Sequence, residues 1–192
     1  MLPRIPSMGL RRILHDATRA AHDRVERAAR LDASPTRERY VHFLSGNHRV
    51  LQVLEPALRD ARALAALGFD LASPRRLEAL ESDLAYLGVK RPRPLRMIQP
   101  DHDAAYLGCA YVLEGSALGA RVLARRWAQP LGFAPGRGAS YLEAGGEQTG
   151  ARWSAFVERL DAVPMDAARM ASCILAAEAT FEAMERALRA PA

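Results

Sequence analysis

The sequence of 192 residues lacks most of the motifs by which catalytic and metal sites are recognised. Its only two cysteines, Cys109 and Cys173, form no CxxC pair, and no Cys/His cluster has zinc spacing. HExxH, GxSxG and GxxxxGK[ST] motifs are all missing. The paired Glu-xx-His motifs of a di-iron bundle are missing too. These absences exclude several common enzyme classes, and we expect both cysteines to be buried free thiols in a reducing cytoplasm.

The sequence also lacks long apolar runs and contains little lysine. No run approaches 18 apolar residues, and the N-terminal stretch lacks the apolar core of a signal peptide, so we expect a cytoplasmic protein without a membrane span. Lys90 is the only lysine among 27 basic residues, and the arginines are scattered along the chain. Most of them fit solvated helix faces, and a minority could serve an anionic ligand or an acidic partner. Aromatic residues (6%) do not alternate with basic ones, which argues against nucleic-acid binding.

The remaining composition favours helices. Ala, Leu, Arg and Glu are abundant while β-branched residues are few, and 192 residues fit one domain with a real core. We predict an all-α, single-domain fold over residues 1–192, with residues 1–8 as a loose N-terminal segment. Expected helix starts lie near Ser7, Ser34-Pro35, Ser73-Pro74, Thr149 and Met165.

Two segments are predicted to interrupt the helices. Residues 90–100 (KRPRPLRMIQP) hold three prolines and cannot form a regular helix. The glycine-rich segment after Leu131 is predicted to be a surface loop with one short turn around residues 140–143. Gly46 and Pro56 are expected bend points in the second helix, and the first helix is expected to end near Leu31.

The stretch from Asp103 to Gln129 has helical periodicity but contains Gly108, Gly115 and Gly119. Each interior glycine costs about 1 kcal/mol relative to alanine. At roughly 100° per residue the three lie within about 20° of one line along the helix. Tyr111 flanks this line and Arg126 ends it. Such a strip of bare backbone suits either a flat ligand with an acidic edge or close helix–helix packing, and spacing alone leaves both open.

His22 and Glu26 stand one helical turn apart in the first predicted helix. The carboxylate could accept a hydrogen bond from the imidazole and leave the other ring nitrogen free for a metal. The alternative is an ordinary i,i+4 hydrogen bond at the edge of the core. If a metal is bound, one histidine must do most of the work, as in haem proteins.

Four stretches, in order and at suitable separations, resemble the bacterial haem oxygenases: LHDATRAAHDRVE, YVLEGSALGARVLARR, TGARWSAFVERL and EATFEAMERAL. The resemblance runs from about Leu10 to Leu188, and YVLEGSALG is its most specific part. Within that family, the sequence resembles the type found beside bacteriophytochromes or in haem-iron acquisition. The resemblance implies a haem-oxygenase-like helical bundle that cleaves haem with O₂ and electrons to biliverdin, CO and ferrous iron. Haem would be both substrate and cofactor.

The resemblance assigns roles along the iron axis. His22 would be the proximal iron ligand, and Glu26 its partner. Gly115 and Gly119 would be the distal-helix glycines that let the backbone approach the iron-bound ligand. Ser116 stands where the mammalian type has an aspartate that orders water, so water must be organised by Ser116, by backbone groups or by another side chain.

Other assignments concern the rim of the macrocycle. Tyr111 would pack near the porphyrin edge, and Ala120 replaces a further glycine of many members. His15, Arg30 and Arg126 are the candidate partners of the propionates. Which meso carbon is oxidised stays open.

No flavin or nicotinamide motif occurs, so electrons would come from a partner such as a ferredoxin or a flavin reductase. A bacteriophytochrome could accept the bilin, and a monomer is the simplest expectation. Two rival functions remain at this point. One is a haem-binding or haem-sensing protein of the same fold that does not degrade haem. The other is a haem-free relative, either a thiaminase-like enzyme or a scaffold.

Overall fold

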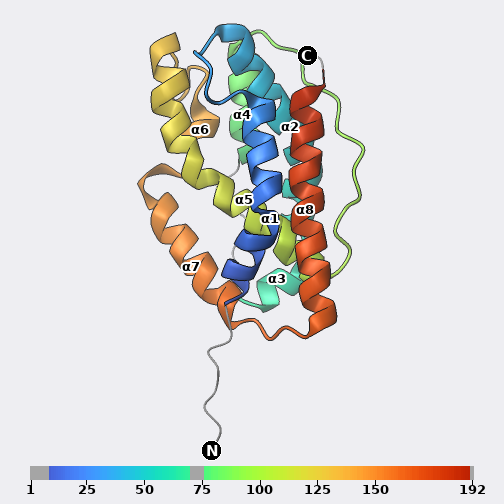
Figure 1. The fold of residues 1–192 in the computed structure, drawn as a ribbon. Coiled ribbons are helices and arrows are strands. Elements are labelled where there is room, and N and C mark those ends of the chain that lie inside the picture. Colours follow the sequence, from blue (N-terminus) through green and yellow to red (C-terminus); the bar gives the residue numbers. More distant parts are fainter. Residues whose placement is uncertain (1–8, 70–75, 191–192) are drawn as a thin grey trace, which may run out of the picture.

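Three long helices form the centre of the structure, a computed structural model that describes residues 9–69 and 76–190. They are α1 (Leu10–Ala29), α5 (Asp103–Leu123) and α8 (Ala167–Arg189), and α8 packs against the other two (Figure 1). The remaining α-helices surround them: α2 (Arg37–Arg59), α3 (Arg62–Ala66), α4 (Arg76–Tyr86), α6 (Ser140–Glu143) and α7 (Thr149–Ala162). The predicted all-helical fold class is thus confirmed.

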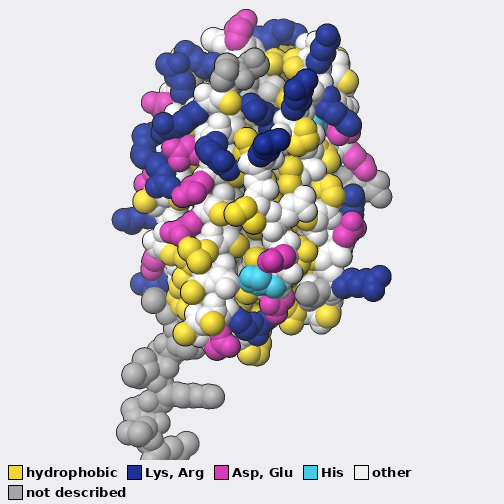
Figure 2. Space-filling view, turned by 90° about the vertical axis from the view of Figure 1, so that its right-hand side faces the viewer, with side chains coloured by type: hydrophobic (Ala, Val, Ile, Leu, Met, Phe, Trp, Pro, Cys, Tyr) yellow, Lys and Arg dark blue, Asp and Glu magenta, His cyan; other side chains and the backbone are white. Residues whose placement is uncertain are grey.

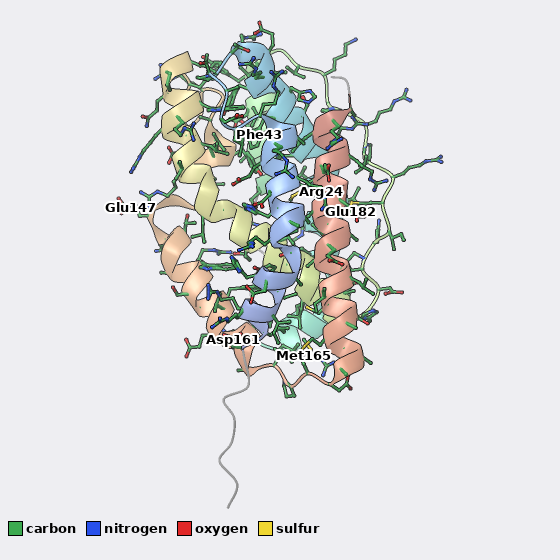
Figure 3. The ribbon with its side chains drawn as sticks, in the orientation of Figure 1. Arg24, Phe43, Glu147, Asp161, Met165 and Glu182 are labelled. Carbon is green, nitrogen blue, oxygen red and sulfur yellow. The ribbon has the colours of Figure 1, made fainter. Side chains whose placement is uncertain are left out.

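Specific polar contacts fix α1 between its neighbours. Asp161 of α7 accepts a hydrogen bond from the Arg11 N–H at 2.8 Å, so it caps the first turn of α1. Farther along, the Arg24 Nε–H donates to Glu185 of α8 at 3.0 Å. Asp161 and Arg24 are both labelled in Figure 3, at the lower end of α7 and between α1 and α8. These contacts hold the helix that carries His22.

The core consists of two hydrophobic clusters. The first joins α1, α5, α7 and α8 and contains Leu14, Leu107 and Leu160. The second joins α2, α4, α6 and the segment after α5, and contains Tyr40, Leu80 and Trp127. Cys109 and Cys173 are buried and free, as predicted, and burial raises the pKa of both thiols.

α5 has two different halves. Residues up to Glu114 are almost all buried, whereas most residues from Gly115 to Leu123 are partly or fully exposed. The helix continues as a π-helical turn (Ala124–Ala128) and a 3₁₀ turn (Gln129–Leu131). In Figure 1 the chain passes behind α1 and then turns upward beside α6. The second half therefore leaves the core and forms the wall of a space.

Gly108 belongs to the buried half and serves helix packing. A Cβ placed on it would lie 2.2 Å from the Cys173 carbonyl oxygen and 2.9 Å from the Ala177 nitrogen, both in α8. Only glycine permits this approach of two backbones. For this glycine the packing alternative is correct.

The helical segment Asp103–Leu131 is long and apolar enough to cross a membrane by length and composition. Half of its most apolar window is buried inside the fold. Because core helices of soluble proteins share these properties, we interpret the segment as a core helix.

Several predicted boundaries shift. α2 begins after Thr36, whose hydroxyl accepts from the Arg39 N–H at 3.2 Å, and not at Ser34-Pro35. It also runs unbroken through the predicted bend points. α1 ends at Ala29 because Arg30 adopts a left-handed conformation (φ 53°), and α8 starts after Asp166. Residues 90–100 form no helix and α6 coincides with the predicted turn. The predicted loose segment 1–8 and the starts at Ser7 and Ser73-Pro74 lie outside the described residues.

Candidate functional site

A cavity of about 280 Å³ lies where the two hydrophobic clusters meet. Its walls come from α1, α2, α5, α6, α7 and α8, and most of its lining is apolar. Seven of the predicted site residues line it: His15, His22, Glu26, Tyr111, Gly115, Ser116 and Gly119. Residues separated by about 90 positions in the chain are thus brought to one space, with α1 on one wall and the exposed half of α5 on another.

His22 lies at the rim of this cavity. Its ring packs edge-on against Phe181 of α8, with centroids 5.8 Å apart, and its side chain is 54% exposed. The Nδ1 atom lies 3.8 Å from Glu26 Oε1 and 4.0 Å from Asp23 Oδ1. Both distances are too long for a hydrogen bond. The predicted His22–Glu26 hydrogen bond is therefore wrong for this geometry, and two exposed carboxylates flank the imidazole instead.

Gly115 and Gly119 line the cavity, and neither lies close to the backbone of a neighbouring helix. A Cβ on Gly115 would only reach ordinary contact with the Trp153 ring, at 3.5 Å, and a Cβ on Gly119 would meet nothing within 4 Å. The missing side chains consequently leave room that no protein group fills. An aromatic wall continues from them, because Trp153 lies 5.8 Å from Tyr111 and stacks on Phe156. For these two glycines the flat-ligand alternative fits the structure.

The polar groups opposite His22 come from Ser116, which was predicted, and from two residues that sequence reasoning missed, Asn47 and Tyr141. The Ser116 hydroxyl donates back to the Leu113 carbonyl at 2.8 Å, so its hydrogen is engaged and its oxygen can only accept. Asn47 of α2 and Tyr141 of α6 also line the cavity, and the Tyr141 hydroxyl donates to Asn47 Oδ1 at 3.1 Å. Burial raises the pKa of Tyr141 to about 12, so its hydroxyl keeps its proton at neutral pH.

Tyr141 is held in place by a buried carboxylate on α4. The two oxygens of Asp83 each accept a backbone N–H from the first turn of α6, from Ser140 and from Tyr141, at 2.8 Å. Asp83 is fully buried, and burial raises its pKa while these hydrogen bonds oppose the shift. The sequence signal was a lone acidic residue among the apolar positions of α4.

Another buried acidic residue anchors α5 at the point where it leaves the core. Glu114 directly precedes Gly115, and its Oε1 lies 2.9 Å from Nη2 of Arg76 in α4. Its Oε2 lies 3.6 Å from Nη2 of Arg152 in α7. Breaking such a buried pair costs about 3–5 kcal/mol. The glycine-bearing half of α5 is therefore fixed to two other helices at its base.

Arg30 and Arg126 do not line the main cavity but an adjoining opening of about 890 Å³. Glu26, Leu31, Gly119 and Leu123 line both spaces, so the opening is the mouth of the cavity. Three arginines and three acidic residues line it: Arg27, Arg30, Arg126, Asp23, Glu26 and Asp32. Arg27 was not among the predicted residues, although it lies in the last turn of α1. The mouth thus places three guanidinium groups beside an equal number of carboxylates, so its formal charge is balanced.

Comparison with known proteins identifies the family. The family described as "Heme oxygenase" matches residues 8–190 of the chain. The chain belongs to the haem oxygenase family. A haem oxygenase of Xanthomonas campestris pv. campestris (strain 8004) is 35% identical over 156 residues, which are 80% of this chain and 90% of that protein.

Solved structures agree with this assignment. The haem oxygenase of Neisseria meningitidis, in crystal structures with NO and CO bound, superimposes with a TM-score of 0.80 and 27% identity. The match covers 95% of this chain and 92% of that one. The haem oxygenase of Leptospira interrogans (TM-score 0.74, 19% identity, 95% and 99% coverage) has the same fold. The predicted family, fold and haem oxygenase function are confirmed, and haem is the substrate and cofactor.

Proposed function

We propose that this haem oxygenase holds haem in the 280 Å³ cavity, with His22 as the iron ligand and Gly115 and Gly119 on the opposite side. One observation carries the proposal: His22 and the two glycines line a single cavity, and the Cβ positions of both glycines are free of clashes. The bound haem supplies the iron chemistry that opens its own ring to biliverdin, CO and ferrous iron. The protein supplies a ligand, a shape and hydrogen bonds.

The neighbours of His22 set the orientation of its ring. Phe181 contacts the ring edge-on and limits its rotation. Glu26 and Asp23 lie at 3.8 and 4.0 Å from Nδ1, close enough to attract a proton there and to leave Nε2 for the iron. In this proposal Glu26 orients the ligand through water or a small shift of its side chain.

The mouth of the cavity suits the acidic edge of haem. Arg30 and Arg126 line it from the end of α1 and from the segment after α5, and they are the proposed partners of the propionates. Arg27 adds a third cation that the sequence did not single out. His15 lies elsewhere in the cavity wall, where its Nδ1–H donates to Asp16 at 3.0 Å and leaves Nε2 for a ligand. Tyr111 would contact the macrocycle from the apolar side.

Proton supply would depend on water held beside the glycine wall. A buried water needs two to four polar partners. The Ser116 oxygen can accept from such a water, and Asn47 and Tyr141 line the same cavity. These three groups would together replace the aspartate that the mammalian type carries at the Ser116 position.

The wider setting of the reaction is part of the proposal. The chain has a formal charge of +5, which favours an acidic electron donor such as a ferredoxin or a flavin reductase. We further propose a cytoplasmic monomer that passes biliverdin to an acceptor such as a bacteriophytochrome.

The test is a hemin titration of wild type, His22→Ala and His15→Ala. His15 is the matched control because it lies on the same helix and lines the same cavity. Wild type and His15→Ala should give a sharp Soret band, whereas His22→Ala should lose it and regain it when millimolar imidazole is added. With reductant, O₂ and catalase, wild type should then develop the biliverdin spectrum.

Equal Soret bands for wild type and His22→Ala would disprove the iron ligand. A normal Soret band without biliverdin would instead indicate a protein that carries haem without degrading it.

A further inference from the structure

Another cavity lies on the other side of α2, away from the haem cavity. It has a volume of about 220 Å³ and lies between α2, the C-terminal end of α8 and the start of the extended segment 90–100. We call it the strap pocket. Its polar lining consists of Ser45 and four basic residues, His42, Arg49, Lys90 and Arg93. It shares no lining residue with the haem cavity.

Positive charge collects on this face of the molecule. None of the described residues that line the strap pocket is acidic. Figure 2 views the face along which residues 90–100 run, and Lys and Arg side chains gather over its upper part. The neighbouring Arg91 forms an ion pair with Glu81, so its charge is already neutralised. Arg49, Lys90 and Arg93 form no ion pair with an acidic residue of the described chain.

Arg49 also carries a buried donor with no acceptor. Within residues 9–69 and 76–190, three buried side-chain polar atoms lack a hydrogen-bond partner, and Arg49 Nε is one of them. The preceding residue supplies another, His48 Nε2, which faces the adjacent cavity beside Glu81. An unsatisfied buried donor costs about 1–3 kcal/mol, and more when it is charged. Such an atom needs an acceptor, which a water molecule or an anion from outside the chain would supply.

The charge count favours a doubly charged acceptor. Arg49, Lys90 and Arg93 supply three positive charges around the strap pocket. The C-terminal end of α8 offsets about half an elementary charge of these. His42 uses its Nε2–H on the Leu188 carbonyl at 2.6 Å, so it takes part in the helix end and not in the charge balance. About two and a half charges remain, which matches a phosphate dianion better than a single carboxylate.

We propose that the strap pocket binds the phosphate group of a small anionic ligand. Arg49 Nε–H donates to one phosphate oxygen, Lys90 and Arg93 close over the group from the extended segment, and the Ser45 hydroxyl donates from α2. Arginine suits this role because its planar donors match the geometry of phosphate oxygens. The site is independent of haem chemistry.

The probe is inorganic phosphate, added to the full-length ¹⁵N-labelled protein at constant ionic strength, with the Arg Nε–Hε signals followed by NMR. The Arg49 signal should shift as phosphate is added, and the shift should level off once the site is saturated. Affinity should fall at least tenfold in Arg49→Gln and in Lys90→Gln. Lys90 is exposed, so its substitution tests the site without disturbing the core. Arg96→Gln is the matched control, since Arg96 is an exposed arginine of the same segment outside the pocket.

Three results would overturn the proposal: a shift of Arg49 that never saturates, equal loss of affinity in Arg96→Gln, or acetate binding as tightly as phosphate. Hemin binding should be unchanged in Lys90→Gln. Failure of this site therefore leaves the proposed haem chemistry untouched, and loss of hemin binding in His22→Ala would say nothing about phosphate.

Discussion

Replacing Gly119 by alanine should raise the free energy of unfolding of the haem-free protein and lower its affinity for hemin. Gly119 lies in the exposed half of α5, and a Cβ there meets nothing within 4 Å. The new methyl group therefore causes no strain, and the helix gains about 1 kcal/mol of propensity. For a chain of this size that gain corresponds to a rise in Tm of about 2–4 °C. The same methyl group projects into the cavity that haem is proposed to fill, so hemin affinity should fall about tenfold, or 1.4 kcal/mol.

Gly108→Ala is the matched control, because it makes the same chemical change in the same helix. Here the Cβ would lie 2.2 Å from a carbonyl oxygen of α8, a backbone atom that cannot move without shifting the helix. Overpacking of this kind costs about 1–3 kcal/mol or more, which exceeds the gain in propensity. The free energy of unfolding should fall, whereas the lining of the haem cavity stays unchanged because Gly108 does not belong to it.

Both variants are measured by urea unfolding of the haem-free protein and by hemin titration. The two changes in unfolding free energy should have opposite signs, and only Gly119→Ala should weaken hemin binding specifically. If Gly119→Ala lowers stability, or if it is more stable and still binds and degrades haem normally, then the glycine does not serve the ligand. The assignment of the α5 wall would then be wrong.

Two further predictions concern other polar groups. Tyr141→Phe should bind hemin within about twofold of wild type but form biliverdin at least about tenfold more slowly, because it removes a hydroxyl that is proposed to hold water; equal single-turnover rates would contradict this. Burial lowers the pKa of His48 below its usual 6.5, so its neutral form stabilises the fold above that pH and this contribution is lost as pH falls through the folded pKa. Between pH 7.5 and 5.5 the free energy of unfolding, measured in urea, should fall less for His48→Gln than for wild type. An equal fall in both proteins would disprove the role of His48.

The fold could be predicted well because local signals and burial agree. The prolines of residues 90–100 exclude a helix, and the short turn at Ser140–Glu143 and the start at Thr149 appear where the sequence places them. A helix start was predicted wrongly where two nearby residues were equally suitable as the N-cap. Ser34 and Thr36 are both good N-cap residues, and the structure uses Thr36. The end of α1 depends on Arg30 taking a left-handed conformation, which is uncommon outside glycine and has no sequence signature.

The residues that line the cavity were predicted on α1 and α5 and missed on α2 and α6. His22 and the glycines are recognisable because each breaks a local rule: an imidazole at the edge of a core stripe, and glycine inside a helix. Asn47 and Tyr141 break no such rule. They reach the cavity only because α2 and α6 pack beside α5, and the contact between them spans 94 positions. The three aligned glycines also differ in their surroundings, because α8 covers only the first of them.

The division within α5 explains how one helix can both stabilise the fold and leave a space open. A glycine that faces a ligand removes contacts as well as propensity, so the exposed half of α5 contributes little to its own stability. Its position must then be fixed from outside. The buried Glu114 does this through Arg76 and Arg152, directly at the residue before Gly115. The close contact of Gly108 with α8 fixes the helix two turns earlier. Beyond the bare stretch, Ala124 and Trp127 are buried in the second hydrophobic cluster, so the glycine-bearing segment is held at both of its ends.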